Sequence, residues 1–231
     1  MFHSKLHERL AAYEFVLCSS SPRRYELLQQ VGITPRVEKS AFKEDLDKSL
    51  YEGDPYRYVS DTSFEKCQEV YSRLRRRNCD TSNREANNDG HCKPLLLLSA
   101  DTVITAKGEI FEKPGSYASN VAMLKTLRDH EEQGTKIEVV SGCTILKEDP
   151  STSTGNVQVR RFLSTTEIHL VKGLTDETIE EYCTSGEGQS VAGGFKIQGS
   201  GCLLFDSISG DYYNCVGLPL SLVYRELGAL V

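Results

Sequence analysis

Apolar positions along the chain fall into short runs that are typical of buried strands. Residues 14–18 (EFVLC) and 94–101 (PLLLLSAD) are nearly continuous apolar segments, whereas residues 136–147 and 157–171 alternate apolar and polar side chains. Both patterns predict β-strands. The predicted strands comprise residues 14–18, 35–41, 94–101, 136–147, 157–171 and 201–208.

Apolar side chains at helical spacing occupy most of the intervening sequence. The first predicted helix has Ser21 as its N-cap and Pro22 as its first residue, and Gly32 ends it. Thr175 opens a later helix, with acidic residues in its first turn. The predicted helices comprise residues 22–31, 55–77, 117–129, 175–183 and 218–230.

Strands and helices mixed in this order indicate an α/β fold. The alternating segments 136–147 and 157–171 predict an antiparallel pair, so we expect a mixed sheet rather than a purely parallel one. Two polar stretches, residues 78–93 and 148–157, predict surface insertions. A chain of 231 residues is long enough for one α/β domain or for two small lobes around a cleft.

Charge and composition disfavour two classes of partner, nucleic acid and membrane. The formal net charge is −6, which disfavours nonspecific nucleic-acid binding because that binding depends on neutralised phosphates. The longest apolar run, Leu95–Leu98, is too short to cross a bilayer. The N-terminus lacks the apolar core of a signal peptide, and the eight cysteines form no C-x-x-C pair. We therefore expect a cytoplasmic protein with reduced thiols that binds neither nucleic acid nor membrane.

The junction between the first strand and the first helix is the first candidate site. It reads LCSSSPRRYELL and supplies Ser19, Ser21, Arg23 and Arg24. Free amides at a helix N-terminus favour an anion, serine hydroxyls add donors, and guanidinium groups grip phosphate oxygens in pairs. The segment fits either a phosphate-binding site or a capped surface helix with solvated arginines.

Two further candidates carry charge at the ends of predicted elements. The apolar strand delivers Asp101 to its expected carboxyl end, where α/β folds place their ligands. A carboxylate there could hold a metal or take a proton from water, or it could simply cap a turn. Lys113 precedes Pro114 and Gly115, which immobilise the backbone beside this cation.

Residues 185–201 (SGEGQSVAGGFKIQGSG) form a glycine-rich candidate site. Small residues allow close approach to a flat ligand, and the Gln198 amide offers a donor and an acceptor suited to a nucleobase edge. Glu44 is a candidate second metal-binding carboxylate, and Lys66 lies on the predicted long helix. An acidic surface and a snorkelling lysine would explain the last two equally well.

Taken together, these residues favour a metal-assisted nucleotide phosphohydrolase. Four cations, two acids, a base-edge amide and close-approach glycines match the parts of a nucleoside triphosphate and its metal ion. The sequence contains no G-x-S-x-G, which disfavours a serine hydrolase, and no P-loop signature.

Five motifs, in order, resemble the Maf family of nucleoside triphosphate pyrophosphatases. They are LCSSSPRRYELLQQVGI, SADTVI, EKPGSYASNVAMLKTL, EEYCTSGEGQSVAGGFKIQGSG and NCVGLPLSLVYREL. The resemblance spans essentially the whole chain apart from the two polar insertions. It implies a single Maf-like domain over residues 1–231, with an elongated mixed sheet flanked by helices and two lobes around a central cleft, as in ITPase-like folds.

The resemblance also implies an activity and assigns roles. It implies hydrolysis of a nucleoside triphosphate to the monophosphate and pyrophosphate, a house-cleaning reaction of nucleotide pools, with Mg²⁺ or Mn²⁺ as cofactor. The family pattern places catalytic roles on Asp101, Lys113, Lys66 and Arg24, and metal binding on Glu44 and Asp101. Substrate binding falls on Ser19, Ser21, Arg23, Arg24, Thr102 and Gln198.

The base preference that the resemblance implies is mixed. Gln198 matches the branch that prefers dTTP and UTP, which we favour because this amide would touch the base. Ser190–Gly193 and Phe195-Lys196 depart from that branch, and the latter pair resembles 7-methyl-GTP hydrolases. A modified-nucleotide pyrophosphatase and a non-catalytic nucleotide sensor that regulates cell division remain the alternatives. The expected partners are the triphosphate and, where the protein assembles, a second copy in a homodimer.

Overall fold

A long mixed sheet forms the centre of the protein. The computed structural model describes residues 3–44, 46–80, 93–149 and 156–231. The sheet has seven strands in the order β2-β1-β3-β5-β6-β7, with β4 paired to β3. The strands are β1 (Glu14–Cys18), β2 (Arg36–Val37), β3 (Leu95–Ala106), β4 (Glu109–Phe111), β5 (Ile137–Glu148), β6 (Val157–Leu170) and β7 (Phe205–Ser209).

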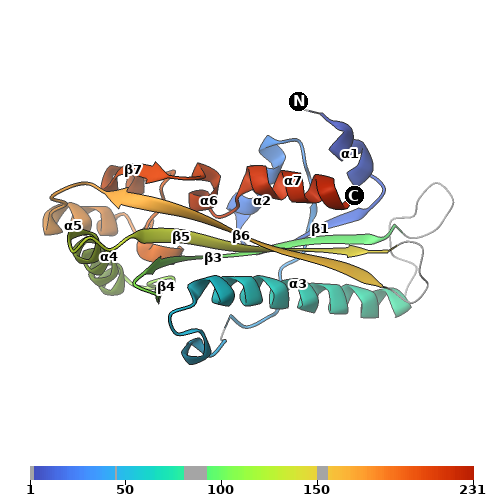
Figure 1. Cartoon of the computed structure of the whole chain (residues 1–231), viewed down its shortest axis with the longest axis horizontal. Coiled ribbons are helices and arrows are strands. Elements are labelled where there is room, and N and C mark those ends of the chain that lie inside the picture. Colours follow the sequence, from blue (N-terminus) through green and yellow to red (C-terminus); the bar gives the residue numbers. More distant parts are fainter. Residues whose placement is uncertain (1–2, 45, 81–92, 150–155) are drawn as a thin grey trace.

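Strand directions confirm the predicted mixed sheet. β1 runs parallel to β2 and β3, while β3, β5, β6 and β7 pair antiparallel along the rest of the sheet. The three strands β3, β5 and β6 extend along the length of the molecule, which gives it an elongated shape (Figure 1). The α/β class expected from the sequence is therefore confirmed.

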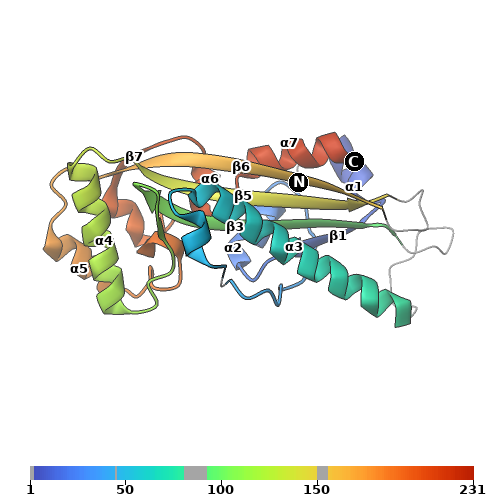
Figure 2. The ribbon, with the colours of Figure 1, turned by 60° about the horizontal axis from the view of Figure 1, so that its bottom comes forward.

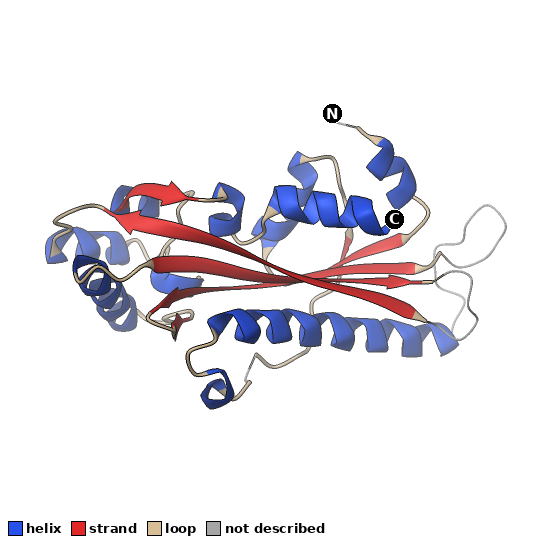
Figure 3. Ribbon diagram, in the orientation of Figure 1, coloured by secondary structure: helices blue, strands red, loops and turns tan. Residues whose placement is uncertain are grey.

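Helices cover both faces of this sheet (Figure 3). One face carries α3 (Pro55–Asp80), and the other carries α1 (Lys5–Leu10), α2 (Pro22–Gln30) and α7 (Leu220–Leu230). Two helices, α4 (Tyr117–Glu132) and α5 (Asp176–Thr184), lie together at one end of the molecule, on the left in Figure 2. The short α6 (Tyr212–Val216) and the 3₁₀ turns η1 (Lys48–Tyr51), η2 (Ala192–Gly194) and η3 (Ser200–Leu204) complete the described elements.

Burial on both faces explains the continuous apolar run of β3. Leu96 and Leu98 pack into the cluster formed with α1, α2 and α7. Leu95 and Leu97 point the other way, into the cluster formed with α3. Alternate side chains of one strand thus enter two cores, because successive residues of a strand face opposite sides of the sheet.

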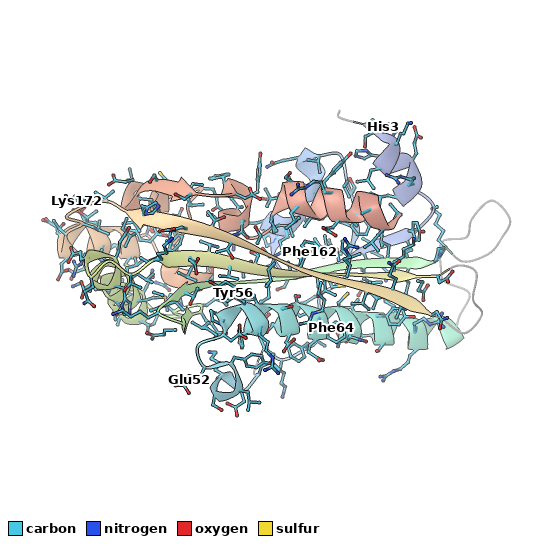
Figure 4. The ribbon with its side chains drawn as sticks, viewed as in Figure 1. His3, Glu52, Tyr56, Phe64, Phe162 and Lys172 are labelled. Carbon is cyan, nitrogen blue, oxygen red and sulfur yellow. The ribbon has the colours of Figure 1, made fainter. Side chains whose placement is uncertain are left out.

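α3 is attached to the sheet by side chains along its length (Figure 4). Near its start, the Tyr56 hydroxyl donates to Glu138 of β5 at 2.6 Å. Further along, the Arg161 guanidinium of β6 lies 5.1 Å from the centre of the Phe64 ring. These contacts fix the helix against β5 and β6.

Several predicted boundaries are corrected by the structure. β3 continues to Ala106, so Asp101 lies within the strand and not at its carboxyl end. β-branched residues after Asp101 prolong the strand, and its pairing with β5 extends to the same point. Of the predicted strand 35–41, only Arg36–Val37 pairs with the sheet.

The predicted strand 201–208 is wrong in its first half. Residues Ser200–Leu204 form a 3₁₀ turn, and only Phe205–Ser209 is a strand. A side chain at Gly201 would lie 2.5 Å from the Lys196 carbonyl, so the chain is folded back on itself here. The helices α1 and α6 were not predicted, because segments of five or six residues show no clear helical period.

The predicted helix caps and thiols are confirmed where the structure describes them. Ser21 and Thr175 are N-caps, and Gly32 adopts the left-handed φ of 78° after α2. The described cysteines are free thiols, and burial raises the pKa of Cys143 to about 12. Most of the predicted insertions, residues 81–92 and 150–155, lie outside the described residues. In the described part of the chain, no helix combines the length and apolarity needed to cross a membrane.

Candidate active site

A cavity of about 300 Å³ opens between the strand ends, α2 and α3. Every site residue predicted from the sequence lines it. These residues are Ser19, Ser21, Arg23, Arg24, Glu44, Lys66, Asp101, Thr102, Lys113 and Gln198. They come from six segments that are distant in the sequence. Their presence in one cavity therefore supports a common site more strongly than any single motif did.

The strand–helix junction forms one wall of the cavity. Arg24 donates from Nε to the Gly217 carbonyl at 2.8 Å, and its terminal nitrogens reach the hydroxyls of Ser19 (3.3 Å) and Thr102 (3.2 Å). Arg23 donates from Nε to the Val216 carbonyl at 3.3 Å. Both guanidinium groups are therefore held in place by the backbone at the C-terminal end of α6.

Electrostatics at this wall favour an anion. Burial and the adjacent charge of Arg24 lower the pKa of Arg23, because two cations are held together away from bulk water. Ser21 caps α2 by position but makes no side-chain capping bond. Ser21 lines the same cavity as the two arginines, so the N-terminal end of α2 lies at this wall.

A lysine between two carboxylates forms a second part of the cavity lining. Lys66 Nζ lies 2.7 Å from Asp101 Oδ1 and 2.9 Å from Glu44 Oε1. The side chains of Lys66 and Asp101 are only 8% and 10% exposed, whereas Glu44 is 43% exposed. The lysine thus compensates a buried aspartate and a more accessible glutamate at once.

The sheet itself explains why Asp101 faces a cavity. β1 pairs with β3 only as far as Cys18 and Ser99, so Asp101 lies just beyond the end of its neighbour. On the other side, Asp101 pairs with Gly142 of β5. A side chain at Gly142 would lie 2.5 Å from the Val59 carbonyl, so this glycine allows α3 to approach and bring Lys66 to the aspartate.

Several cations of the cavity affect the pKa of Glu44. Burial opposes its ionisation, but the attraction of Lys66, followed by Lys113 and Arg24, outweighs this effect and lowers the pKa of Glu44. The carboxyl is therefore charged at neutral pH. Lys113 itself is exposed at the cavity edge.

The glycine-rich segment also contributes to the cavity lining. Val191, Ala192, Phe195 and Gln198 line it. Gly193 has a φ of 72°, and a side chain there would lie 2.2 Å from Ile104. Gln198 is exposed, so its amide is accessible to a ligand.

Glu44 and Asp101 are the residues suited to a divalent metal ion. Among the described residues, no group of three or more His, Cys, Asp and Glu side chains could hold a metal. Magnesium, however, is commonly bound by one or two carboxylates together with substrate phosphates and water. Two carboxylates facing a cationic cavity fit that chemistry, with the Lys66 ammonium between them.

Sequence reasoning missed several residues around the cavity. Lys39 and Gly217 line it, and neither belonged to a motif that spacing alone would mark. Glu69 and Arg73 lie behind the segment that carries Glu44. Their i, i+4 spacing on a helix predicts an ion pair but gives no indication of what that pair holds.

An α/β fold with a cavity of about 300 Å³ lined by several cations is typical of proteins that bind phosphorylated compounds. The profile of the Maf-like protein family matches residues 14–230. The chain belongs to this family, as its motifs predicted.

Curated relatives cover nearly the whole chain. A dTTP/UTP pyrophosphatase of Saccharomyces cerevisiae is 38% identical over 220 residues, which cover 94% of this chain and 90% of the relative. A dTTP/UTP pyrophosphatase of Schizosaccharomyces pombe is 37% identical over 224 residues, covering 96% and 86%. One from Thermoanaerobacter sp. is 32% identical over 214 residues, covering 93% and 95%.

Proposed function

We propose that this protein is a nucleoside triphosphate pyrophosphatase that hydrolyses dTTP and UTP to the monophosphate and pyrophosphate. The observation that carries the proposal is the convergence of four cations, Arg23, Arg24, Lys66 and Lys113, on one cavity with Asp101. The names of the relatives from both yeasts and from Thermoanaerobacter support the same pyrimidine substrates.

The cavity residues divide into binding and chemical roles. Arg23, Arg24 and Lys113 bind the triphosphate oxygens, with Ser19 and Ser21 adding hydroxyl donors. Gln198 contacts the edge of the base. The Thr102 hydroxyl accepts a hydrogen bond from Arg24 and so helps to hold that guanidinium group in place. Positioning and charge stabilisation supply most of the catalysis of phosphoryl transfer.

Asp101 orients the attacking water and accepts its proton. The water oxygen forms a bond to the α-phosphorus while the bond from that phosphorus to the β-bridging oxygen breaks, and pyrophosphate leaves with the electron pair. Lys66 holds the Asp101 carboxylate at 2.7 Å and so fixes the direction in which it faces. The cations that bind the β- and γ-phosphates stabilise the departing charge.

Glu44 and Asp101 would hold a divalent metal ion, Mg²⁺ or Mn²⁺. When bound, such an ion neutralises phosphate charge and acts as a Lewis acid. The homodimer and the cytoplasmic location stay predictions of the sequence.

A pyrophosphate-release assay over a panel of triphosphates tests the proposal. The panel contains dTTP, UTP, dCTP, GTP and 7-methyl-GTP, each with Mg²⁺ and with Mn²⁺. We expect the fastest release with dTTP and UTP. A preference for 7-methyl-GTP would instead favour a modified-nucleotide pyrophosphatase. No release of pyrophosphate from any nucleotide would favour a nucleotide sensor.

A further inference from the structure

The segment that carries Glu44 is held from behind by α3. Residues 38–44 follow β2 and supply Lys39, Ser40, Phe42 and Glu44 to the cavity. The Glu38 amide still donates to the Leu17 carbonyl at 3.0 Å. Beyond it, no main-chain hydrogen bond ties residues 39–44 to another main-chain group of the described chain. Side chains therefore have to fix this segment.

Glu69 binds the middle of the segment. Its Oε2 accepts from the Ala41 amide at 2.8 Å and from the Ser40 hydroxyl at 3.0 Å. The Ser40 oxygen in turn accepts from the Phe42 amide at 3.1 Å. One carboxylate oxygen thus orders three consecutive residues of the segment.

Arg73 binds its beginning and also holds Glu69. Its Nε donates to the other Glu69 oxygen at 2.9 Å, Nη1 to Glu38 at 3.0 Å, and Nη2 to the Lys39 carbonyl at 2.8 Å. Burial opposes ionisation of Glu69, but its bonds to Arg73, Ala41 and Ser40 outweigh this and lower its pKa. A planar guanidinium is suited to this task because it presents several donors in fixed directions.

The same helix contributes Lys66 to the cavity. Lys66 and Glu69 are three residues apart on α3, and Lys66 Nζ meets Glu44 at 2.9 Å. The helix therefore carries both the lysine and the residues that hold the glutamate segment. Neither Glu69 nor Arg73 is among the described residues that line the cavity.

We propose that Glu69 and Arg73 are positioning residues that set Glu44 and Lys39 against Lys66 and Asp101. They act through the segment 38–44 and touch no substrate. Loss of this support lets Glu44 move away from the other carboxylate and weakens binding of the triphosphate with its metal ion. The inference rests on the proposed function, since the substrate it concerns is the triphosphate of that reaction.

Glu69→Ala is the test, with Glu65→Ala as its matched control. Glu65 is exposed and lies one turn earlier on α3, and its side chain makes no hydrogen bond or ion pair with described residues. We expect kcat/KM for UTP to fall about 10- to 100-fold in Glu69→Ala, the usual effect of losing a residue that orients a metal ligand. The change should lie mainly in KM and in the Mg²⁺ concentration for half-activation. Glu65→Ala should behave as wild type.

Glu69→Gln separates positioning from folding. Its amide oxygen still accepts from Ala41, but its amino group faces the Arg73 Nε donor and loses that bond, so we expect activity between that of Glu69→Ala and wild type. Hydrogen exchange without substrate should show faster exchange of the Ala41 and Phe42 amides in Glu69→Ala, and unchanged exchange in β3 and β5. Equal kinetics of Glu69→Ala and Glu65→Ala, or a loss confined to kcat, would overturn the proposal.

Failure of the proposed function would be separately visible. Wild-type protein that releases no pyrophosphate from any triphosphate would refute the reaction only. Calorimetric titration with UTP and Mg²⁺ then decides the positioning role. Weaker UTP binding by Glu69→Ala than by Glu65→Ala supports it, and equal binding overturns it.

Discussion

Lys66 links the two carboxylates on which the proposed chemistry depends. Its ammonium contacts Asp101 at 2.7 Å and Glu44 at 2.9 Å, and its side chain is 8% exposed. A buried ion of this kind destabilises the folded protein unless its partners are present, so the stability contribution of each of the three charges depends on the other two. Each can be removed singly or in pairs.

Asp101→Asn is expected to lower kcat for dTTP about 100- to 1000-fold. The amide cannot accept a proton from water, and the loss of one well-placed group typically costs a rate factor of this size. Lys66 keeps Glu44 as a partner, so the fold should survive. Pyrophosphate release and circular-dichroism melting measure the two quantities, and near-wild-type turnover would remove Asp101 from the mechanism.

Lys66→Met is expected to destabilise the protein by about 3 kcal/mol, because it leaves the Asp101 carboxylate buried without its cation. Adding Asp101→Asn to this variant should recover much of the stability but none of the activity. Urea unfolding of the two single variants and the double variant gives the comparison. Additive losses in the double variant would show that the two side chains do not act together.

Individual site residues were predictable from the sequence, but their partners were not. The motifs S-P-R-R and K-P-G carry recognisable chemistry at fixed spacing, so Arg24 and Lys113 could be marked as candidate site residues. The bond from Arg24 to the Gly217 carbonyl joins residues 193 positions apart. No local pattern contains that information, because it arises only when α2 and the segment after α6 pack together.

At the scale of elements, the close approach of α3 to β5 positions the site. Gly142 lies opposite Asp101, and its missing side chain leaves room for the Val59 carbonyl. The sequence predicted both α3 and β5 but not this contact, since a glycine in a strand indicates close approach without naming the neighbour. Strand β3 likewise was predicted to end at Asp101, because the apolar run before it dominates the pattern.

Gly142→Ala is expected to lower stability by about 1–3 kcal/mol, as overpacking usually does. It should also reduce activity, since displacing α3 moves Lys66 away from Asp101. Gly228→Ala is the control. Gly228 lies inside α7 with only the Arg9 side chain near it, at 3.8 Å, so alanine should be neutral or stabilise by up to about 1 kcal/mol. Equal melting temperatures of the two variants would contradict the close-packing account.

At the scale of the whole molecule, ion pairs between α3 and its neighbours make the stability of the fold depend on pH in the acid range. Burial opposes ionisation of Glu38 and Glu69, but Arg73 outweighs it and lowers the pKa of both. The same balance, with Arg161 as the cation, lowers the pKa of Asp61. The pair of Arg73 with Glu38 joins α3 to the segment after β2, and the pair of Arg161 with Asp61 joins it to β6.

Stability is therefore expected to be flat above about pH 5 and to fall below the ordinary glutamate pKa of about 4.3. Groups whose folded pKa is lowered contribute fully above their unfolded pKa, and the contribution is lost as the pH falls through the folded value. Urea unfolding between pH 3 and pH 7 measures it. Arg73→Ala should flatten the acid slope, and an unchanged slope in that variant would assign the effect to other groups.

The arginine anchors near the C-terminal end of the chain have a consequence for synthesis. Arg23 and Arg24 emerge from the ribosome early, but the carbonyls of Val216 and Gly217 that hold them follow 193 residues later. A nascent chain therefore lacks these two acceptors until Val216 and Gly217 have been translated. Products truncated before Val216 would lack both anchors, so their arginine side chains would not be held in the arrangement that lines the cavity.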